Sequence, residues 1–157
     1  MENDLVRIAL LLDEANGRRE VVLAKSGIEA DTFIVHSISA FTYGLGWKDC
    51  IRLLDKERGA YEITERGGQL VVRLYVDGSL DRPVIQRLTD EVVGLGGSFE
   101  VAKNAAQASG MSLLLIALSA EHGFANVERL MGPCEAAGYR WEYGNVYDAE
   151  GNPLNWW

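Results

Sequence analysis

The stretch "ERGGQLVVRLYVD" (65–77) marks a change of pattern in the chain, and this change decides the fold. Its last nine residues alternate as a β-strand should. Before it, β-branched and apolar runs are separated by glycine-rich turns, and no helical period appears. After it, strands alternate with two helical patterns. We therefore expect an α+β protein with a β-rich subdomain at residues 1–66 and a second subdomain at residues 67–157.

The first subdomain is predicted to contain five short strands and no helix. Residues 5–13 place alternate apolar side chains on one face, and Asn16-Gly17 is a strong hairpin signal. The other strands are expected at residues 20–25, 32–38, 50–55 and 60–64. Short strands with glycine-rich turns are typical of a small β-barrel or a strongly curled sheet. We expect a small β-barrel-like unit.

The second subdomain is predicted to have the order β-α-β-β-α-β. Helices are expected at residues 81–94, with Asp81 as the N-cap, and at residues 126–138, with a kink or interruption at Gly132-Pro133. The apolar run at 112–119 is typical of a strand buried on both faces. This order is that of a ferredoxin-like sandwich, with both helices on one face of an antiparallel sheet. The remaining strands are expected at residues 69–77, 98–103 and 140–147, with a connector at 105–110.

The charge balance bears on the choice of partner. The chain has 15 basic and 23 acidic side chains and a net charge of -8, and both halves have an acidic excess. Without a basic tail or stripe, nucleic acids and anionic membranes are poor partners. A protein with a basic surface is a better one, because opposite fields favour encounter.

The sequence predicts a cytoplasmic protein. Cys50 and Cys134 lie far apart without metal-binding spacing, so two buried thiols in a reducing compartment are expected. The start "MENDLVRIALLLDE" is acidic and has Arg7 within its apolar run, which is unlike a signal peptide. The longest apolar run, "LLLIAL" at 113–118, is too short to span a bilayer.

The stretch "YGLGWKD", which begins at Tyr43, could be a ligand loop or a tight turn. It lacks the third glycine and the following helix of a dinucleotide loop, and the Gly-Lys-Ser/Thr of a Walker loop. We expect a turn in which Gly44 and Gly46 adopt positive φ and Asp49 accepts hydrogen bonds from freed backbone amides. The alternative is an exposed aromatic rim of Tyr43 and Trp47 that binds a partner.

Three segments resemble a bacterial family known as domain of unknown function 4265. The first is "SISAFTYGLGWKDCI" (37–51), the second "ERGGQLVVRL" (65–74) and the third "GYRWEY" (138–143). Matching residues in the first two are Phe41, Tyr43, Gly44, Asp49, Ile51, Glu65, Arg66, Gly68 and Arg73. Ser37, Ser39 and Lys48 stand where the family has Asn, Pro and Gly, and Gln69 stands where a histidine is common. The resemblance covers roughly residues 5 to 148 and implies no activity.

No catalytic residue, cofactor or metal site is predicted. His36 and His122 have no second ligand at metal spacing, so His36 is expected in the core or the barrel lining and His122 on the surface. A Cys50–His36 or Cys134–His122 nucleophile pair stays open, although no flanking motif supports it. We are uncertain whether the chain is an enzyme and favour the view that it is not.

Three arginines could form a cationic site. Arg66, Arg73 and Arg140 either make structural ion pairs, Arg73 with Glu142, or form a clamp for an anion or a partner carboxylate. Together with the aromatic residues they complete the predicted binding set, which is Tyr43, Trp47, Asp49, Arg66, Gln69, Arg73, Trp141 and Tyr143.

Two functions of different class follow. The first is a non-enzymatic acidic protein-binding module, such as an immunity- or antitoxin-type inhibitor of a bacterial toxin. The second is a small-molecule-binding regulatory module or an unrecognised enzyme, with a pocket between the two subdomains. Trp156 and Trp157 are expected to pack back on the domain or into a second copy, which would make a homodimer through the tail. Deleting residues 153–157 should then change the melting temperature or the oligomeric state.

Overall fold

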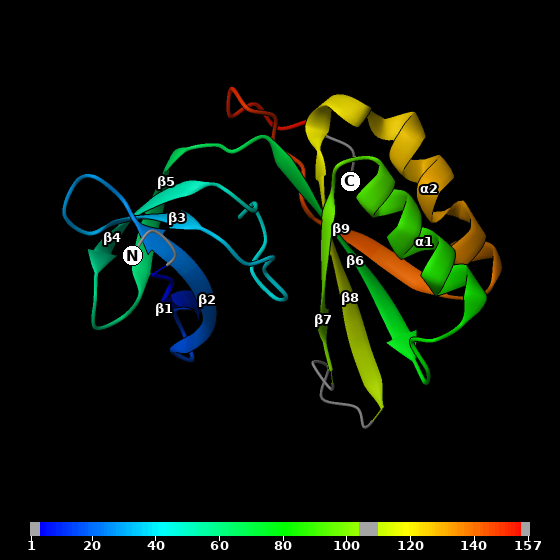
Figure 1. Cartoon of the computed structure of the whole chain (residues 1–157). Coiled ribbons are helices and arrows are strands. Elements are labelled where there is room, and N and C mark those ends of the chain that lie inside the picture. The colour runs from blue at the N-terminus through cyan, green and yellow to red at the C-terminus, as the bar shows by residue number, and fades with distance from the viewer. Residues whose placement is uncertain (1–3, 104–109, 155–157) are drawn as a thin grey trace.

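The computed structural model describes residues 4–103 and 110–154 of the 157-residue chain. These residues form two antiparallel β-sheets and two α-helices (Figure 1). The first sheet consists of β1 (Val6–Asp13), β2 (Arg18–Ser26), β3 (Thr32–Val35), β4 (Cys50–Asp55) and β5 (Ala60–Glu65). The second unit consists of β6 (Gln69–Asp77), α1 (Pro83–Gly94), β7 (Ser98–Ala102), β8 (Met111–Ser119), α2 (Phe124–Ala136) and β9 (Arg140–Asn145), with a short 3₁₀ turn at Ala120–His122.

The first sheet is an open meander in the order β1-β2-β3-β4-β5. Strands β1 and β5 approach each other where the Leu11 N–H donates to the Gly59 carbonyl at 2.9 Å. The described strands do not close into a barrel, so the barrel-like prediction is corrected. The core of this sheet includes Leu45, which belongs to the segment between β3 and β4 and is fully buried. The Leu45 side chain, which comes from outside the sheet, therefore fills part of the core that the strands of a closed barrel would otherwise surround.

The second sheet has the order β7-β8-β6-β9, and every pairing is antiparallel. Its two central strands, β6 and β8, are buried along most of their length, as the apolar run at 112–119 predicts. Both helices cover one face, where side chains such as Leu88 and Leu130 pack on Leu74 and Ile116. The α+β prediction is thus confirmed as two antiparallel sheets and two helices.

Both helices differ in detail from the sequence prediction. The N-cap of α1 is Arg82 and not Asp81, because Pro83 restricts the preceding residue to extended backbone (φ -73°, ψ 144°). Helix α2 continues through Pro133, so the predicted interruption is wrong. Buried residues on both sides of the proline, Met131 and Cys134, hold the helix against the sheet despite the missing hydrogen bond.

The opposite face of the second sheet is covered by the first unit (Figure 1). Residues 36–49, which link β3 to β4 and are called the junction segment below, supply Ile38 to this contact. Ile38 packs with Val71 and Leu115, and Trp47 lies against the same cluster. The second sheet thus lies between two helices on one face and the junction segment on the other.

Two predictions concern residues that the structure does not describe. The connector expected at 105–110 lies outside the described residues except for Gly110, and Trp156 and Trp157 also lie outside them. Within the described part of the chain, neither helix has the length and apolar character needed to cross a membrane.

Candidate functional site

The turn at residues 40–42 of the junction segment is held by a carboxylate from β2. Glu20 accepts hydrogen bonds from the backbone N–H groups of Ala40 (2.6 Å), Phe41 (3.2 Å) and Thr42 (3.0 Å), and from the Thr42 hydroxyl (2.7 Å). Successive N–H groups aimed at one point form a favourable anion site. Sequence reasoning missed Glu20, although a carboxylate on the inward face of an alternating strand, in line with Val22, is a usable signal.

Arg73 in β6 binds the junction segment to the second sheet. Its side chain is buried, and its Nε–H donates to the Ser39 carbonyl at 3.3 Å. One Nη donates to Glu142 in β9 at 3.2 Å. The other Nη donates to the Ser39 hydroxyl at 3.4 Å and to the Thr42 carbonyl. The structural ion pair with Glu142 that the sequence suggested is present.

The Arg73 guanidinium is enclosed by an aromatic ring and a glycine. Its Cζ lies 4.8 Å from the ring centroid of Tyr43, within the range of a cation–π contact. A Cβ atom on Gly144 would lie 2.8 Å from the same Cζ, so the residue facing the guanidinium has no room for a side chain. Arg73 is therefore occupied by internal contacts and is not available as an open anion clamp.

A second arginine makes a separate polar contact at the other end of the junction segment. Arg66 donates to the Gly44 carbonyl at 2.6 Å, to Asp49 at 3.2 Å and to the Asn145 side-chain oxygen at 3.2 Å. Its Cζ lies 3.9 Å from the ring centroid of Tyr147. The side-chain amide of Asn145 in turn donates to the backbone carbonyl of Gln69 at 2.8 Å. Arg66 thus connects the two units as Arg73 does.

Asp49 stabilises the turn as predicted. Its carboxylate accepts from the N–H of Gly46 at 2.7 Å and from the N–H of Gly67 at 2.8 Å. Burial raises the pKa of Asp49, and the two backbone N–H groups and Arg66 act in the opposite direction. A buried carboxylate with this set of donors has a structural role, which favours the turn interpretation of this stretch.

The glycines of this stretch behave differently from each other. Gly44 has φ +81°, as predicted, but Gly46 does not have a positive φ. A Cβ on Gly46 would lie 2.7 Å from the Asn145 amide nitrogen and 2.9 Å from the Gln69 carbonyl, so close approach explains this glycine. The positive φ occurs instead at Lys48 (+72°), the position at which the resembling family has glycine.

An aromatic hollow of about 550 Å³ opens at the edge of the junction. It is lined by Tyr43 of the junction segment and by Trp141, Glu142 and Tyr143 of β9, and these four residues define the aromatic hollow below. Trp141 and Tyr143 make an edge-to-face contact with ring centroids 5.1 Å apart. Tyr43 is 63% exposed as a residue, so part of this aromatic surface faces solvent.

One charged residue, Glu142, lines the aromatic hollow. The Tyr43 hydroxyl donates to Glu142 at 2.6 Å, and this bond raises the pKa of Tyr43 to about 12. Burial, with the nearby Glu128 of α2, raises the pKa of Tyr143 to about 12 as well. Both phenols therefore stay neutral in ordinary buffers, and the carboxylate of the hollow is Glu142, which is ion-paired with Arg73.

The structure gathers most of the predicted binding residues at the junction. Tyr43, Arg73, Trp141 and Tyr143 lie around Glu142, whereas Asp49 and Arg66 lie around Asn145, where Gln69 contributes its backbone carbonyl. Trp47 is only half exposed and lies under the Lys48 ammonium at 4.3 Å, so it does not share a rim with Tyr43. Arg140 lies in another hollow with Arg82 and Asp77, apart from the other two arginines.

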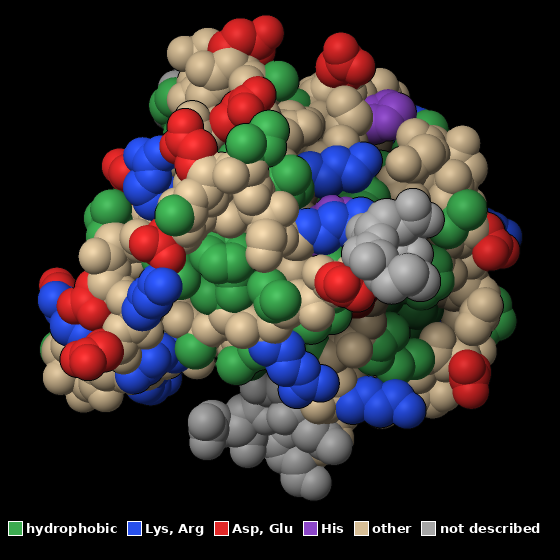
Figure 2. All heavy atoms as spheres, turned by 60° about the vertical axis from the view of Figure 1, so that its left-hand side comes forward, with side chains coloured by type: hydrophobic (Ala, Val, Ile, Leu, Met, Phe, Trp, Pro, Cys, Tyr) green, Lys and Arg blue, Asp and Glu red, His purple; other side chains and the backbone are tan. Residues whose placement is uncertain are grey.

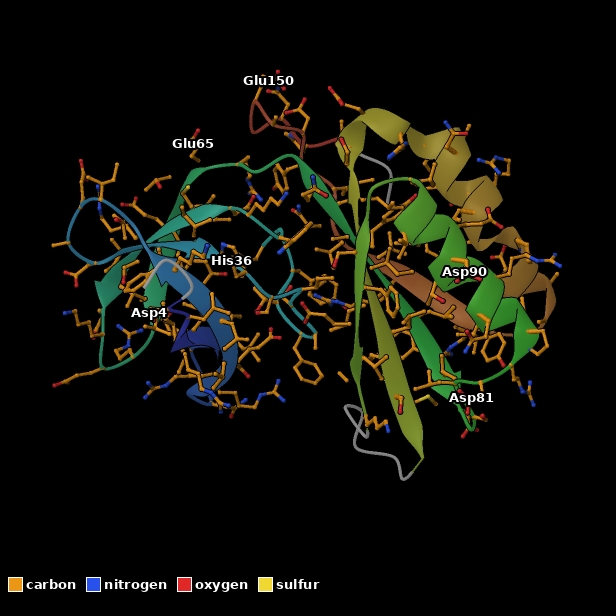
Figure 3. The ribbon with its side chains drawn as sticks, viewed as in Figure 1. Asp4, His36, Glu65, Asp81, Asp90 and Glu150 are labelled. Atoms are coloured by element: carbon orange, nitrogen blue, oxygen red, sulfur yellow. The ribbon has the colours of Figure 1, made fainter. Side chains whose placement is uncertain are left out.

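The titratable side chains outside the junction are dispersed. Figure 3 shows His36 in the first unit, with Asp81 and Asp90 on the far side of the molecule. Burial lowers the pKa of His36, and Lys25 and Lys48 add to this effect. Cys134 is buried as predicted, whereas Cys50 is only half-buried. Among residues 4–103 and 110–154, no three His, Cys, Asp or Glu side chains form a group that could hold a metal ion.

The surface of the first unit carries both positive and negative side chains, and neither sign forms a large patch on the side that Figure 2 shows. Figure 2 shows acidic and basic side chains interspersed on that side of the molecule, with hydrophobic side chains gathered between them. Ion pairs such as Arg52 with Glu29 at 2.7 Å neutralise part of this charge. This view agrees with the absence of a strong basic stripe in the sequence.

Two antiparallel sheets that share a buried polar junction define this chain as a two-unit α+β protein. It belongs to the family described as Domain of unknown function (DUF4265), whose model matches residues 20–143. The predicted family resemblance is thus confirmed. The match spans Glu20, the whole junction segment and the aromatic hollow.

The fold is similar to that of a solved structure described as "Novel crystal structure of a hypothetical protein from Neisseria gonorrhoeae". The TM-score is 0.61 at 12% sequence identity, and the likeness covers 91% of this chain and 96% of that one. At such low identity the likeness concerns the fold alone. No match was found among curated proteins.

Proposed function

We propose that this chain is a non-enzymatic module that binds a basic partner protein at the aromatic hollow, as an immunity- or antitoxin-type inhibitor of a bacterial toxin would. The observation that carries the proposal is the aromatic hollow itself, in which three aromatic side chains surround one carboxylate at the surface. Aromatic residues in a pocket are the usual anchors of protein interfaces.

The chemistry of the aromatic hollow suits a guanidinium or ammonium group. Aromatic faces attract cations, and Glu142 adds a carboxylate to the lining. Glu142 already accepts hydrogen bonds from Arg73 and Tyr43, so the rings supply the larger part of the attraction. The net charge of -8 would speed the approach of a basic partner from longer range.

The internal contacts of the other candidate residues also support a non-enzymatic role. Asp49 pairs with Arg66, Arg73 pairs with Glu142, and Asp49, Arg66 and Arg73 also bind the backbone of the junction segment. A catalytic group needs a substrate-facing atom with free hydrogen-bonding capacity. Residues that already hold two sheets together are poorly placed for such a role.

Calorimetric titration with a hexa-arginine peptide tests the proposal. Saturable binding that weakens roughly tenfold in Tyr43→Ala is expected, because one aromatic anchor is lost. Glu142→Gln should weaken binding less. Glu91→Gln on α1 and Phe41→Ala are matched controls, since they change an exposed charge and an exposed aromatic side chain that do not line the hollow. Equal losses in the hollow variants and the controls would mean unspecific charge attraction and would refute the proposal.

The toxin-inhibitor form of the proposal has a separate genetic test. A reading frame for a toxin should lie beside the gene, and co-expression of this chain should relieve the toxicity of its product. Relief should fail with Tyr43→Ala and persist with Phe41→Ala. A neighbouring metabolic operon and no relief would favour the second candidate function.

The second candidate is a small-molecule-binding regulatory module, because the aromatic hollow is lined from both predicted subdomains. Tyr43 belongs to residues 1–66, and the three β9 residues belong to residues 67–157. Its volume of about 550 Å³ lies in the range of ligand pockets. A quaternary ammonium such as tetramethylammonium is a suitable probe, and a rise in melting temperature that disappears in Tyr43→Ala would favour this candidate.

We also propose a fold class for the second unit and a cellular location for the chain. We assign the second unit to the ferredoxin-like class, which the β-α-β-β-α-β order and the sheet order β7-β8-β6-β9 support. A cytoplasmic location is supported by the two free cysteines.

A further inference from the structure

We propose that a hollow at one end of the second unit, with Arg82 and Arg140 in its lining, binds the phosphate group of a small phosphate monoester. The hollow has a volume of about 350 Å³ and lies where β6 leads into α1 and where α2 leads into β9 (Figure 1). The polar side chains of this arginine hollow come from Tyr75, Asp77, Arg82, Tyr139 and Arg140. Phosphate binding here is independent of the proposed function, because none of these residues lines the aromatic hollow.

Two arginines that are distant in the sequence converge on the arginine hollow. Arg82 is the N-cap of α1, and one of its Nη groups donates to the Tyr139 hydroxyl at 3.0 Å. Arg140 begins β9 and is the register partner of Tyr75 in β6, so these two side chains are neighbours on one face of the sheet. Each arginine therefore has a tyrosine beside it, and the bond to Tyr139 uses one of the five N–H donors of Arg82.

The positive charge of the arginine hollow is not neutralised by an ion pair within the described part of the chain. There, no carboxylate oxygen lies within 4.0 Å of a side-chain nitrogen of Arg82 or Arg140. Asp77 is in the same lining, so two guanidinium groups outweigh one carboxylate in a chain whose net charge is -8. A concave surface with an excess of one charge raises the local concentration of counter-ions. The dipoles at the start of α1 and at the end of α2 oppose each other here, so the arginines supply the attraction.

A phosphate group suits two guanidinium groups better than a carboxylate does. One arginine fork occupies both oxygens of a carboxylate, whereas a phosphate monoester has three terminal oxygens in a tetrahedral arrangement and can accept from two forks. Asp77 narrows the choice of ligand, because its carboxylate repels a bare anion but can accept a hydrogen bond from a hydroxyl group of the same ligand. The volume is at the low end of the range for ligand pockets, so the organic part is small. The arginine hollow is thus suited to a short polyol phosphate.

Calorimetric titration of the full chain with glycerol 3-phosphate tests the site. Saturable binding is expected, and its affinity should fall about tenfold or more in Arg82→Gln and in Arg140→Gln, because each variant loses charged hydrogen bonds to the phosphate. Arg87→Gln is the matched control, since Arg87 is also exposed on α1 and does not line the hollow. All three arginines are exposed, so the variants should fold, and thermal unfolding checks this. No saturable binding to the unaltered chain, or an equal loss in Arg87→Gln, would overturn the proposal.

Inorganic phosphate and acetate test the chemical class of the ligand. Inorganic phosphate should bind more weakly than glycerol 3-phosphate, and Asp77→Asn should reduce this difference because it removes both the repulsion and the acceptor for the hydroxyl group. Equal affinity for the two phosphates in the unaltered chain would overturn the polyol part of the ligand, and acetate that binds as tightly as glycerol 3-phosphate would overturn the phosphate.

Two variants distinguish this site from the aromatic hollow. Tyr43→Ala should leave the affinity for glycerol 3-phosphate unchanged, and Arg82→Gln should not weaken binding of the hexa-arginine peptide. The two sites can therefore fail separately. A loss of glycerol 3-phosphate binding in Tyr43→Ala would overturn the placement of the ligand in the arginine hollow.

Discussion

One face of the second sheet is covered by α1 and α2, whose side chains form an apolar cluster with the sheet, whereas the other face is covered by the junction segment together with the buried Arg73. On the helical face the covering elements are close in sequence to the strands that they cover. On the junction face Arg73 binds carbonyl groups more than thirty residues earlier in the chain. Apolar contacts tolerate small shifts, but hydrogen bonds to a buried guanidinium do not. The junction face therefore fixes the position of the first unit on the second.

Among the substitutions that test this difference between the two faces, replacing Arg73 should lower the free energy of unfolding the most. Arg73→Met removes the charge and takes this donor away from the Ser39 and Thr42 carbonyls and from Glu142, which keeps the Tyr43 hydroxyl as a donor. A loss of about 3–5 kcal/mol in the free energy of unfolding is expected, as for one partner removed from a buried ion pair. Urea unfolding measures it. Arg87→Met on exposed α1 is the matched control, with a change within about 0.5 kcal/mol. Similar small losses in both variants would show that the junction contact is weak.

Two glycine substitutions, one on each face, should change the free energy of unfolding in opposite directions. Gly46→Ala forces a Cβ against Asn145 and the Gln69 carbonyl and should cost about 1–3 kcal/mol. Gly132→Ala in α2 meets no atom within 4 Å and should stabilise the chain by about 0.5–1 kcal/mol through helix propensity. Thermal unfolding of both variants checks the pair. A stabilising Gly46→Ala would contradict the close packing of the junction.

Lys48 should be a site of stabilisation within the junction segment. Its φ of +72° is strained for a residue with a Cβ, so Lys48→Gly should raise the free energy of unfolding by about 0.5–1 kcal/mol. The lost contact with Trp47 offsets part of the gain. Lys56→Gly serves as the control, because Lys56 has no positive φ and pairs with Asp31 at 2.9 Å. If both substitutions destabilise the chain, the left-handed backbone at Lys48 is wrong.

The smallest expected effect is on the pH dependence of stability. Glu100 in β7 accepts the Ile38 N–H at 3.2 Å, and burial raises its pKa. Because the folded chain holds this proton more tightly than the unfolded chain does, stability should fall as pH rises from the ordinary pKa of the group to the raised one. Glu100→Gln should flatten this slope, and Glu91→Gln on exposed α1 should not. Parallel slopes in wild type and Glu100→Gln would show that Glu100 does not titrate as a buried group.

The two faces also differ in how well the sequence predicts them. The apolar run at 112–119 and the stripe that includes Leu88 follow from local periodicity. The structure places the stripe in the core of the helical face and divides the strand between the two faces, with Leu114 on the helical side and Leu115 on the junction side. The hydrogen bonds of Glu20, Arg66 and Arg73 link distant segments, and no period reports them. The pair of Arg73 and Glu142 was suggested from their types, but the burial of Arg73 under Tyr43 depends on the absence of a side chain at Gly144.

Two predictions for the first unit are wrong for a common physical reason, which is the path of the chain after β3. The strand expected at 32–38 ends at Val35, because the chain then leaves the first sheet to cover the second. The barrel-like unit is an open sheet for the same reason, since the junction segment brings Leu45 into its core. Local propensity describes the residues of a strand well, but it does not say which sheet a long connection will cover.

Native-state hydrogen exchange at Ala40, Thr42 and Gly44 tests most directly whether the junction segment belongs to the core of the second sheet. The account predicts that these amides, bonded to Glu20 and to the Gly144 carbonyl, exchange only with an opening free energy close to that of β6 and β8. Fast exchange through low-energy local opening, while β6 and β8 stay protected, would contradict it and would show a mobile loop at this site.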